Sequence, residues 1–111
     1  MPKKLFRNLK VGDSIYGFQH NDYTTSQVEE FVITKMENVN ILVEERIQNV
    51  WVFEFKGHKY SYRINDFEMD DYFINHIDKY GIELYLSTDS KDEVMKYRDW
   101  YNDLLEDAWI N

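Results

Sequence analysis

Hydrophobic and polar residues alternate along much of this chain, and a period of two is typical of half-buried β-strands. In one segment rich in β-branched residues, Phe31 and Ile33 fall on the same face. Glu37 and Asn38 then interrupt the pattern, so we expect a new strand after them. The strands predicted in this way are 14–19, 28–36, 41–47, 51–55, 60–64 and 82–86. The pattern of residues 65–80 fits no single element.

The clearest hairpin joins the segments 51–55 and 60–64. A two-residue loop of Gly57 and His58 suits a type II′ turn, because glycine readily takes the positive φ of the first central position. The register then places six hydrophobic side chains on one face, in the pairs Phe55 with Tyr60, Phe53 with Tyr62 and Trp51 with Ile64.

Residues 90–107 show the 3.6-residue period of an amphipathic helix. Ser90 and Glu93 have the spacing of a capping box at its start. The apolar positions expected to pack on the sheet are Val94, Tyr97, Tyr101, Leu104 and Leu105. We therefore predict an α+β fold, mostly β: a small, strongly bent antiparallel sheet or SH3-like barrel over about residues 9–87, with one C-terminal helix packed on it.

The composition narrows the class of protein. A chain of 111 residues that is 43% hydrophobic is expected to form a single domain over 1–111. The lack of Cys excludes disulfides, thiolate metal sites and a Cys nucleophile. No apolar run approaches the ~18 residues of a membrane span, and no signal peptide is visible, so we expect a cytoplasmic protein, in the producing cell or in a host cell.

Catalytic motifs are absent from the sequence. His20, His58 and His76 are scattered without metal-ligand spacing, and no nucleotide-binding loop or nucleophile motif occurs. We expect a non-enzymatic protein without a cofactor. The alternative is a metal-dependent enzyme, since four clustered carboxylates are of the type that binds Mg²⁺ or Ca²⁺, although they lack the EF-hand pattern. These are Asp66, Glu68, Asp70 and Asp71.

Charge is distributed unevenly. Residues 1–65 have a balance of +1 and residues 66–111 a balance of −9, which together give the net −8 of the chain. Such an asymmetry repels nucleic acid and attracts a basic partner. On the predicted helix, one acidic stripe lies opposite the apolar face: Asp92, Asp99, Asp103 and Glu106.

Carboxylates four residues apart on a helix are separated by about 6 Å, similar to the roughly 7 Å between successive phosphates of a DNA strand. The stripe therefore suits a DNA mimic, with the 66–71 carboxylates as a second patch. The alternative is an ordinary solvated helix face. Trp100, off the apolar centre, and Trp109 are further candidates to anchor a partner or a second copy of the chain. The aromatic hairpin face is expected to be core rather than a stacking platform for nucleic acid.

Residues 9–16 (LKVGDSIY) resemble the VGD-x-I/V-Y opening of small SH3-like barrels of bacteria and their phages. Residues 85–89, followed by Asp92 and Glu93, are similar to the strand-to-helix exit of those short proteins. The resemblance implies a fold and no functional residue. In size and charge the chain also looks like phage-encoded inhibitors of bacterial defence, such as anti-CRISPR proteins.

Together these observations favour a non-enzymatic, acidic protein-binding module. Our hypothesis is a phage-type inhibitor that occupies the basic groove of a nucleic-acid-handling host protein, without binding nucleic acid or membrane itself. The alternative is a structural or regulatory barrel that binds a protein through an aromatic surface.

Overall fold

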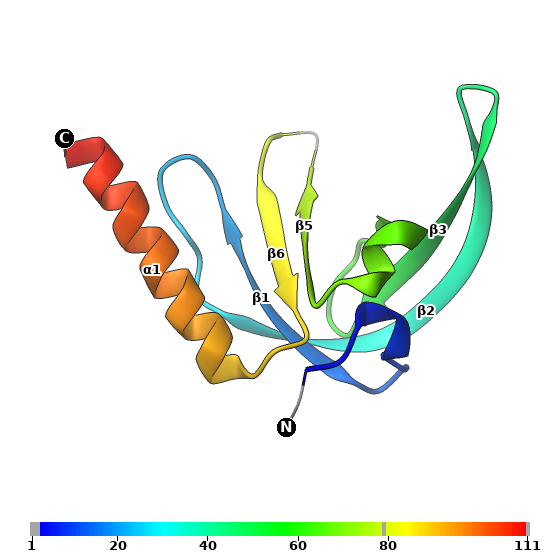
Figure 1. Cartoon of the computed structure of the whole chain (residues 1–111), viewed down its shortest axis with the longest axis horizontal. Helices are drawn as coiled ribbons and strands as arrows, with labels where there is room; N and C mark the ends of the chain where they lie inside the picture. The colour runs from blue at the N-terminus through cyan, green and yellow to red at the C-terminus, as the bar shows by residue number, and fades with distance from the viewer. Residues whose placement is uncertain (1–2, 79, 111) are drawn as a thin grey trace.

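The computed structural model describes residues 3–78 and 80–110, with the side chains of Trp109 and Ile110 left undescribed. It is an antiparallel sheet of six strands in the order β4-β3-β2-β1-β6-β5, followed by one helix, α1. This confirms the predicted α+β, mostly β class (Figure 1). The bent sheet does not close into a barrel, and β4 and β5 are its edge strands. The strands are β1 Ser14–His20, β2 Glu29–Val43, β3 Arg46–Phe55, β4 Tyr62–Asn65, β5 Phe73–Ile77 and β6 Glu83–Ser87.

Strand β2 runs for 15 residues without the predicted break, so the break at Glu37 and Asn38 and the strand at 41–47 were wrong. The chain reverses instead at Glu44 and Glu45, which both take positive φ, 49° and 67°. Polar residues do not interrupt β2 because its second half is fully buried on neither face, so their side chains remain in water or bond to one another. There the Asn38 side chain hydrogen-bonds across the ladder to Asn49, at 2.8 Å.

Beyond the pairing of Val50 with Asn65, β2 and β3 pair only with each other. We call residues 39–49 the hairpin arm; it projects from the rest of the protein in Figure 1. Leu42 and Ile47, a cross-strand pair in the arm, are 74% and 77% exposed. The arm therefore has no core of its own.

The predicted β3–β4 hairpin forms, with Phe53 opposite Tyr62 and Trp51 opposite Ile64. Its turn lies one residue earlier than expected. The His58 N–H donates to the Phe55 carbonyl at 3.1 Å, so Gly57, with φ 80°, is the third turn residue, as in a type II turn rather than II′. The predicted pair of Phe55 with Tyr60 is absent, because the chain joins the ladder only at Tyr62.

Strands β1 and β6 are covered on both faces. One face contributes to the main core, which also contains residues from every other strand and from two short 3-10 helices, η1 (Phe6–Asn8) and η2 (Asp66–Asp70). The other face packs Phe18 and Tyr85 against Val94 of α1. The strands approach closely: a Cβ on Gly17 would lie 2.1 Å from the Tyr85 carbonyl oxygen.

The unassigned segment 65–80 contains η2 and the edge strand β5. Met69 of η2 is fully buried in the main core, whereas Phe67 is 73% exposed. The acidic residues around Met69 therefore surround an apolar anchor.

Helix α1 spans Lys91–Ile110, three residues longer at its end than predicted. The Ser90 hydroxyl caps the Glu93 N–H at 3.3 Å, as expected, but the Ser90 N–H donates to Asp89 at 2.8 Å rather than to Glu93. Val94 is 2% exposed. Leu104, predicted to pack on the sheet, is 50% exposed, because it lies off the line that Val94 shares with positions 101 and 105.

Candidate functional site

The acidic stripe of α1 lies on solvent-exposed surface. Asp92, Asp99, Asp103 and Glu106 are all exposed. Asp99 pairs with the neighbouring Arg98 at 3.0 Å, and Glu106 accepts a hydrogen bond from the Asn102 amide at 3.2 Å. Within the described part of the chain, Asp92 and Asp103 have no ion pair. The helix therefore presents carboxylates that its own basic residues neutralise only in part.

The second predicted patch has a different environment. Arg7 of η1 donates from Nη1 to Asp66 Oδ1 at 3.0 Å and from Nε to Asp70 Oδ1 at 2.8 Å. The indole N–H of Trp51 also donates to Asp66 Oδ1, at 2.9 Å. The hydrogen bond from Trp51, followed by that from Arg7, lowers the pKa of Asp66. Two of the four acids thus hold together segments that are far apart in the sequence.

The two acidic regions do not form one surface. Figure 1 shows η2 beside β3, at the opposite side of the sheet from α1. Glu68 is partly buried and Asp71 is exposed. The sequence did not reveal this arrangement because Arg7 precedes Asp66 by 59 positions. Both regions thus keep carboxylates without an ion pair in the described residues, but only segment 66–71 uses two of its acids to hold distant parts of the chain together.

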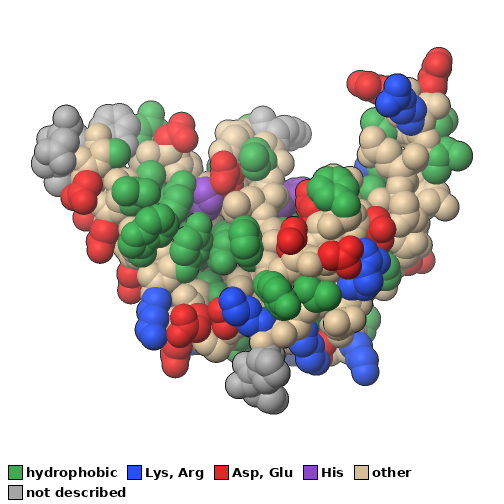
Figure 2. All heavy atoms as spheres, in the orientation of Figure 1, with side chains coloured by type: hydrophobic (Ala, Val, Ile, Leu, Met, Phe, Trp, Pro, Cys, Tyr) green, Lys and Arg blue, Asp and Glu red, His purple; other side chains and the backbone are tan. Residues whose placement is uncertain are grey.

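An aromatic row, missed as a unit by the sequence analysis, adjoins the stripe. It consists of Phe73, Tyr85, Tyr97 and Trp100, whose successive ring centroids are 5.7, 4.7 and 5.8 Å apart. Phe73 is 54% and Trp100 58% exposed. Figure 2 shows hydrophobic side chains gathered over α1 and the neighbouring strands, with acidic side chains along the outer edge of the helix. Phe73 was overlooked because it lies in the unassigned segment.

Polar contacts fix α1 on the sheet and so place this surface. The Thr25 hydroxyl donates to the Asn102 side chain at 3.0 Å, and Arg98 Nε donates to the Ser26 carbonyl at 3.0 Å. The Tyr101 ring packs on the His20 ring, with centroids 4.7 Å apart. Burial, followed by the nearby Glu83 carboxylate, raises the pKa of Tyr101. The row and the stripe therefore lie on a helix that hydrogen bonds and ring packing hold against the sheet and the loop after β1.

No known family model, curated protein or solved structure matches this chain. Among the described helices, none is long and apolar enough to cross a membrane. In residues 3–78 and 80–110, no three His, Asp or Glu side chains come together as metal ligands, the 66–71 carboxylates included. The surface chemistry of α1 and of the strands beside it is therefore the feature that indicates a function.

Proposed function

We propose that this protein is a non-enzymatic binding module that docks on a basic protein surface through the outer face of α1. One observation carries the proposal: an aromatic row that is exposed at its two ends, Phe73 and Trp100, lies beside the acidic stripe, in which Asp92 and Asp103 have no ion pair in the described chain. Tyr97 stacks on Trp100, which lies between Asp99 and Asp103 in the helix sequence. Protein interfaces commonly combine an apolar centre with a charged rim.

The two parts of this surface contribute differently to binding. Trp100 is the principal anchor, because tryptophan is enriched among residues whose truncation weakens binding by 2 kcal/mol or more, as a rough guide. The carboxylates of the stripe accelerate association with a basic partner and disfavour acidic ones. A partner that covers both would bury the rings while its Lys or Arg side chains pair with the stripe.

We extend the proposal to a partner whose basic surface ordinarily binds nucleic acid. Asp99, Asp103 and Glu106 follow one another at three- or four-residue spacing, which puts their charges about 6 Å apart, close to the phosphate spacing of a DNA strand; Asp92 lies two helical turns before Asp99. The net charge of −8 disfavours direct binding of nucleic acid by this chain. On this proposal the protein acts as an inhibitor that competes with nucleic acid for the same groove.

A second candidate is a regulatory module that binds through the aromatic row alone. The observation that favours it is the extent of the row, which continues from α1 across β6 to Phe73 on the edge strand β5. A partner on this surface needs an apolar complement and no basic groove.

Matched variants separate the two candidates. One is the stripe reversal D92K/D99K/D103K/E106K; its control is E29K/E37K/E44K/E45K, which changes the net charge equally at four exposed positions on or beside β2. The third is Trp100→Ala. Each immobilised protein is used to capture partners from nuclease-treated lysate, and the captured protein is then purified for affinity and competition measurements.

The leading proposal expects the stripe reversal to abolish binding, the control reversal to retain it, and added DNA to displace the protein. Binding also weakens as salt rises, since the Debye length falls from about 10 Å at 0.1 M to about 3 Å at 1 M. The second candidate expects Trp100→Ala to abolish binding while the stripe reversal does not. Equal binding by all three variants contradicts both.

A further inference from the structure

The gap between the two edge strands, which we call the seam of the sheet, contains a second candidate site, separate from the acidic stripe. Edge strands β4 and β5 approach each other, and the rings of Tyr62 and His76 meet across the gap in an edge-on contact at 5.3 Å. Beside this contact lies a groove of about 630 Å³. A cavity of this volume is in the range that holds small ligands.

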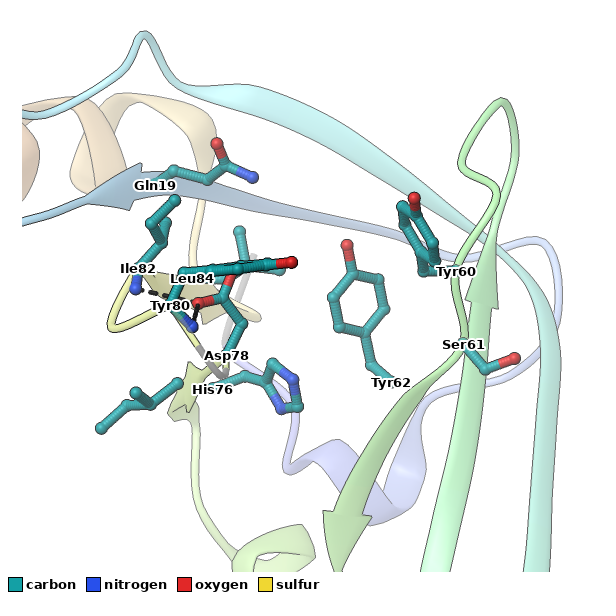
Figure 3. Close-up of a pocket in the computed structure, with 10 residues that line it drawn as sticks. Gln19, Tyr60, Ser61, Tyr62, His76, Asp78, Tyr80, Ile82 and Leu84 are labelled. Atoms are coloured by element: carbon teal, nitrogen blue, oxygen red, sulfur yellow. Dashed lines mark hydrogen bonds between the residues drawn. The ribbon is translucent and has the colours of Figure 1, made fainter.

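Aromatic side chains from both sides line this seam groove (Figure 3). Tyr60 comes from the loop between β3 and β4, and Tyr80 from the loop between β5 and β6. They are 74% and 77% exposed, while Tyr62 between them is partly buried. Leu84, 4% exposed, also lines the groove. The rings of three tyrosines thus line the groove, together with an apolar residue.

The groove also contains a carboxylate whose position is fixed. Asp78 Oδ1 accepts hydrogen bonds from the N–H groups of Tyr80, at 2.8 Å, and Ile82, at 3.0 Å. These bonds are drawn in Figure 3, where Asp78 lies beside Tyr80 in the groove. Burial raises the pKa of Tyr62, and the negative charges of Glu29 and Asp78 raise it further. Two carboxylates thus place negative charge near this ring, which favours a cation over an anion beside it.

The described residues that line the groove include no Lys or Arg. Among these residues an anionic ligand would meet the Asp78 carboxylate, and the imidazole of His76 would be the one ionisable nitrogen group. A cation would find one carboxylate and the negative faces of aromatic rings, the combination that proteins use to bind quaternary ammonium groups.

We propose that the seam groove binds an alkylammonium cation, with Tyr60, Tyr62 and Tyr80 around the alkyl groups and Asp78 supplying the countercharge. The proposal is independent of the function assigned to α1, because none of these residues lies in the stripe or the aromatic row. The same chemistry is present in a free quaternary ammonium compound and in a trimethylated lysine side chain.

Choline tests the charge requirement, with 3,3-dimethyl-1-butanol as a neutral control of nearly the same shape. The full chain is titrated with each compound while its backbone and tyrosine ring resonances are followed by NMR. We expect choline to shift resonances of residues that line the groove and to bind at least tenfold more tightly than the alcohol. Equal binding of the two compounds, or choline shifts confined to other surfaces, overturns the proposal.

Variants test the assignment of residues. Asp78→Asn keeps an oxygen that accepts the bonds of the turn but removes the charge, and Tyr80→Leu removes a ring; each is expected to weaken choline binding at least tenfold. Phe67→Leu changes an exposed ring on η2 and is the control. If both groove variants keep the wild-type fold in their spectra and bind choline with unchanged affinity, the proposal is also overturned.

A final experiment distinguishes the two sources of the cation. A short peptide with one trimethylated lysine is compared with choline at the same groove. Tighter binding of the peptide, with shifts extending beyond the groove, supports a side-chain ligand; binding no tighter than that of choline supports a free small molecule. Failure of both cations to bind overturns the proposal and leaves the function assigned to α1 unaffected.

Discussion

The acidic segment 66–71 and the acidic stripe of α1 look alike in the sequence but differ in the fold. In the first, Arg7 and Trp51 bind Asp66, and Arg7 also binds Asp70. In the second, Asp92 and Asp103 have no ion pair within the described residues. A count of carboxylates therefore does not distinguish acids that hold segments together from acids that remain available to a partner.

The ion pairs of the first region are not its main attachment. Arg7, Asp66 and Asp70 have side chains that are 36–62% exposed, and solvent-exposed pairs of this kind contribute little to stability. Met69, fully buried in the main core, contributes more. The two regions also differ in this respect: segment 66–71 has an apolar anchor among its acids, whereas the anchor of α1, Val94, lies on the opposite face of the helix.

The largest effect on stability is expected at Met69, the apolar anchor of segment 66–71. Met69→Ala should lower the free energy of unfolding by about 2–5 kcal/mol, because it leaves a cavity in the core. Phe67→Ala, in the same 3-10 helix but 73% exposed, should change it by less than about 0.5 kcal/mol. Urea denaturation measures both. A Met69→Ala loss no larger than that of Phe67→Ala would show that η2 is not anchored by its apolar residue.

A smaller effect is expected on α1. Val94→Ala should lower the free energy of unfolding by roughly 1.5–3 kcal/mol, since the Val94 side chain is 2% exposed and packs against the sheet. Leu104→Ala removes a larger side chain but should cost less than about 1 kcal/mol, because half of it is already in water. Urea denaturation of the two variants and the wild type measures both losses. Equal losses for the two variants would place Leu104 in the core and contradict the observed packing.

Acid should affect the first region through Asp66. Its pKa in the folded state lies below the ordinary value of 3.8, so its stabilisation is fully present above that value and is lost as the pH falls through the folded pKa. Asp66→Asn removes this titration. The stability difference between wild type and Asp66→Asn should therefore shrink as the pH is lowered from 6 to 3. A difference that stays constant over this range would argue against the Arg7 and Trp51 contacts as its cause.

The smallest effect on folding is expected from the stripe. The D92K/D99K/D103K/E106K reversal relieves like-charge repulsion but removes one acid from the first helical turn, and these changes oppose each other. The free energy of unfolding should stay within about 1 kcal/mol of wild type. A large loss of stability would mean that the carboxylates of the stripe, like that of Asp66, make stabilising contacts within the protein.

The sequence predicted most strands, the Phe53–Tyr62 register and the helix, because local alternation and periodicity determine these features. It did not predict β2 as one continuous strand, since Glu37 and Asn38 interrupt the hydrophobic pattern where the strand passes from the core into the hairpin arm. It placed the acids of α1 on one exposed face. It did not predict the pairing of Arg7 with Asp66 or the seam groove, because both depend on contacts between distant segments.

The hairpin arm has a consequence for local opening. Its two strands pair only with each other, and a lone two-stranded hairpin is marginally stable in water. Backbone amides in 39–49 should therefore exchange with deuterium through openings that leave the rest of the sheet folded. The Glu44–Glu45 tip is the natural place for limited proteolysis or for insertion of a peptide tag, because a break there disturbs no residue of the core.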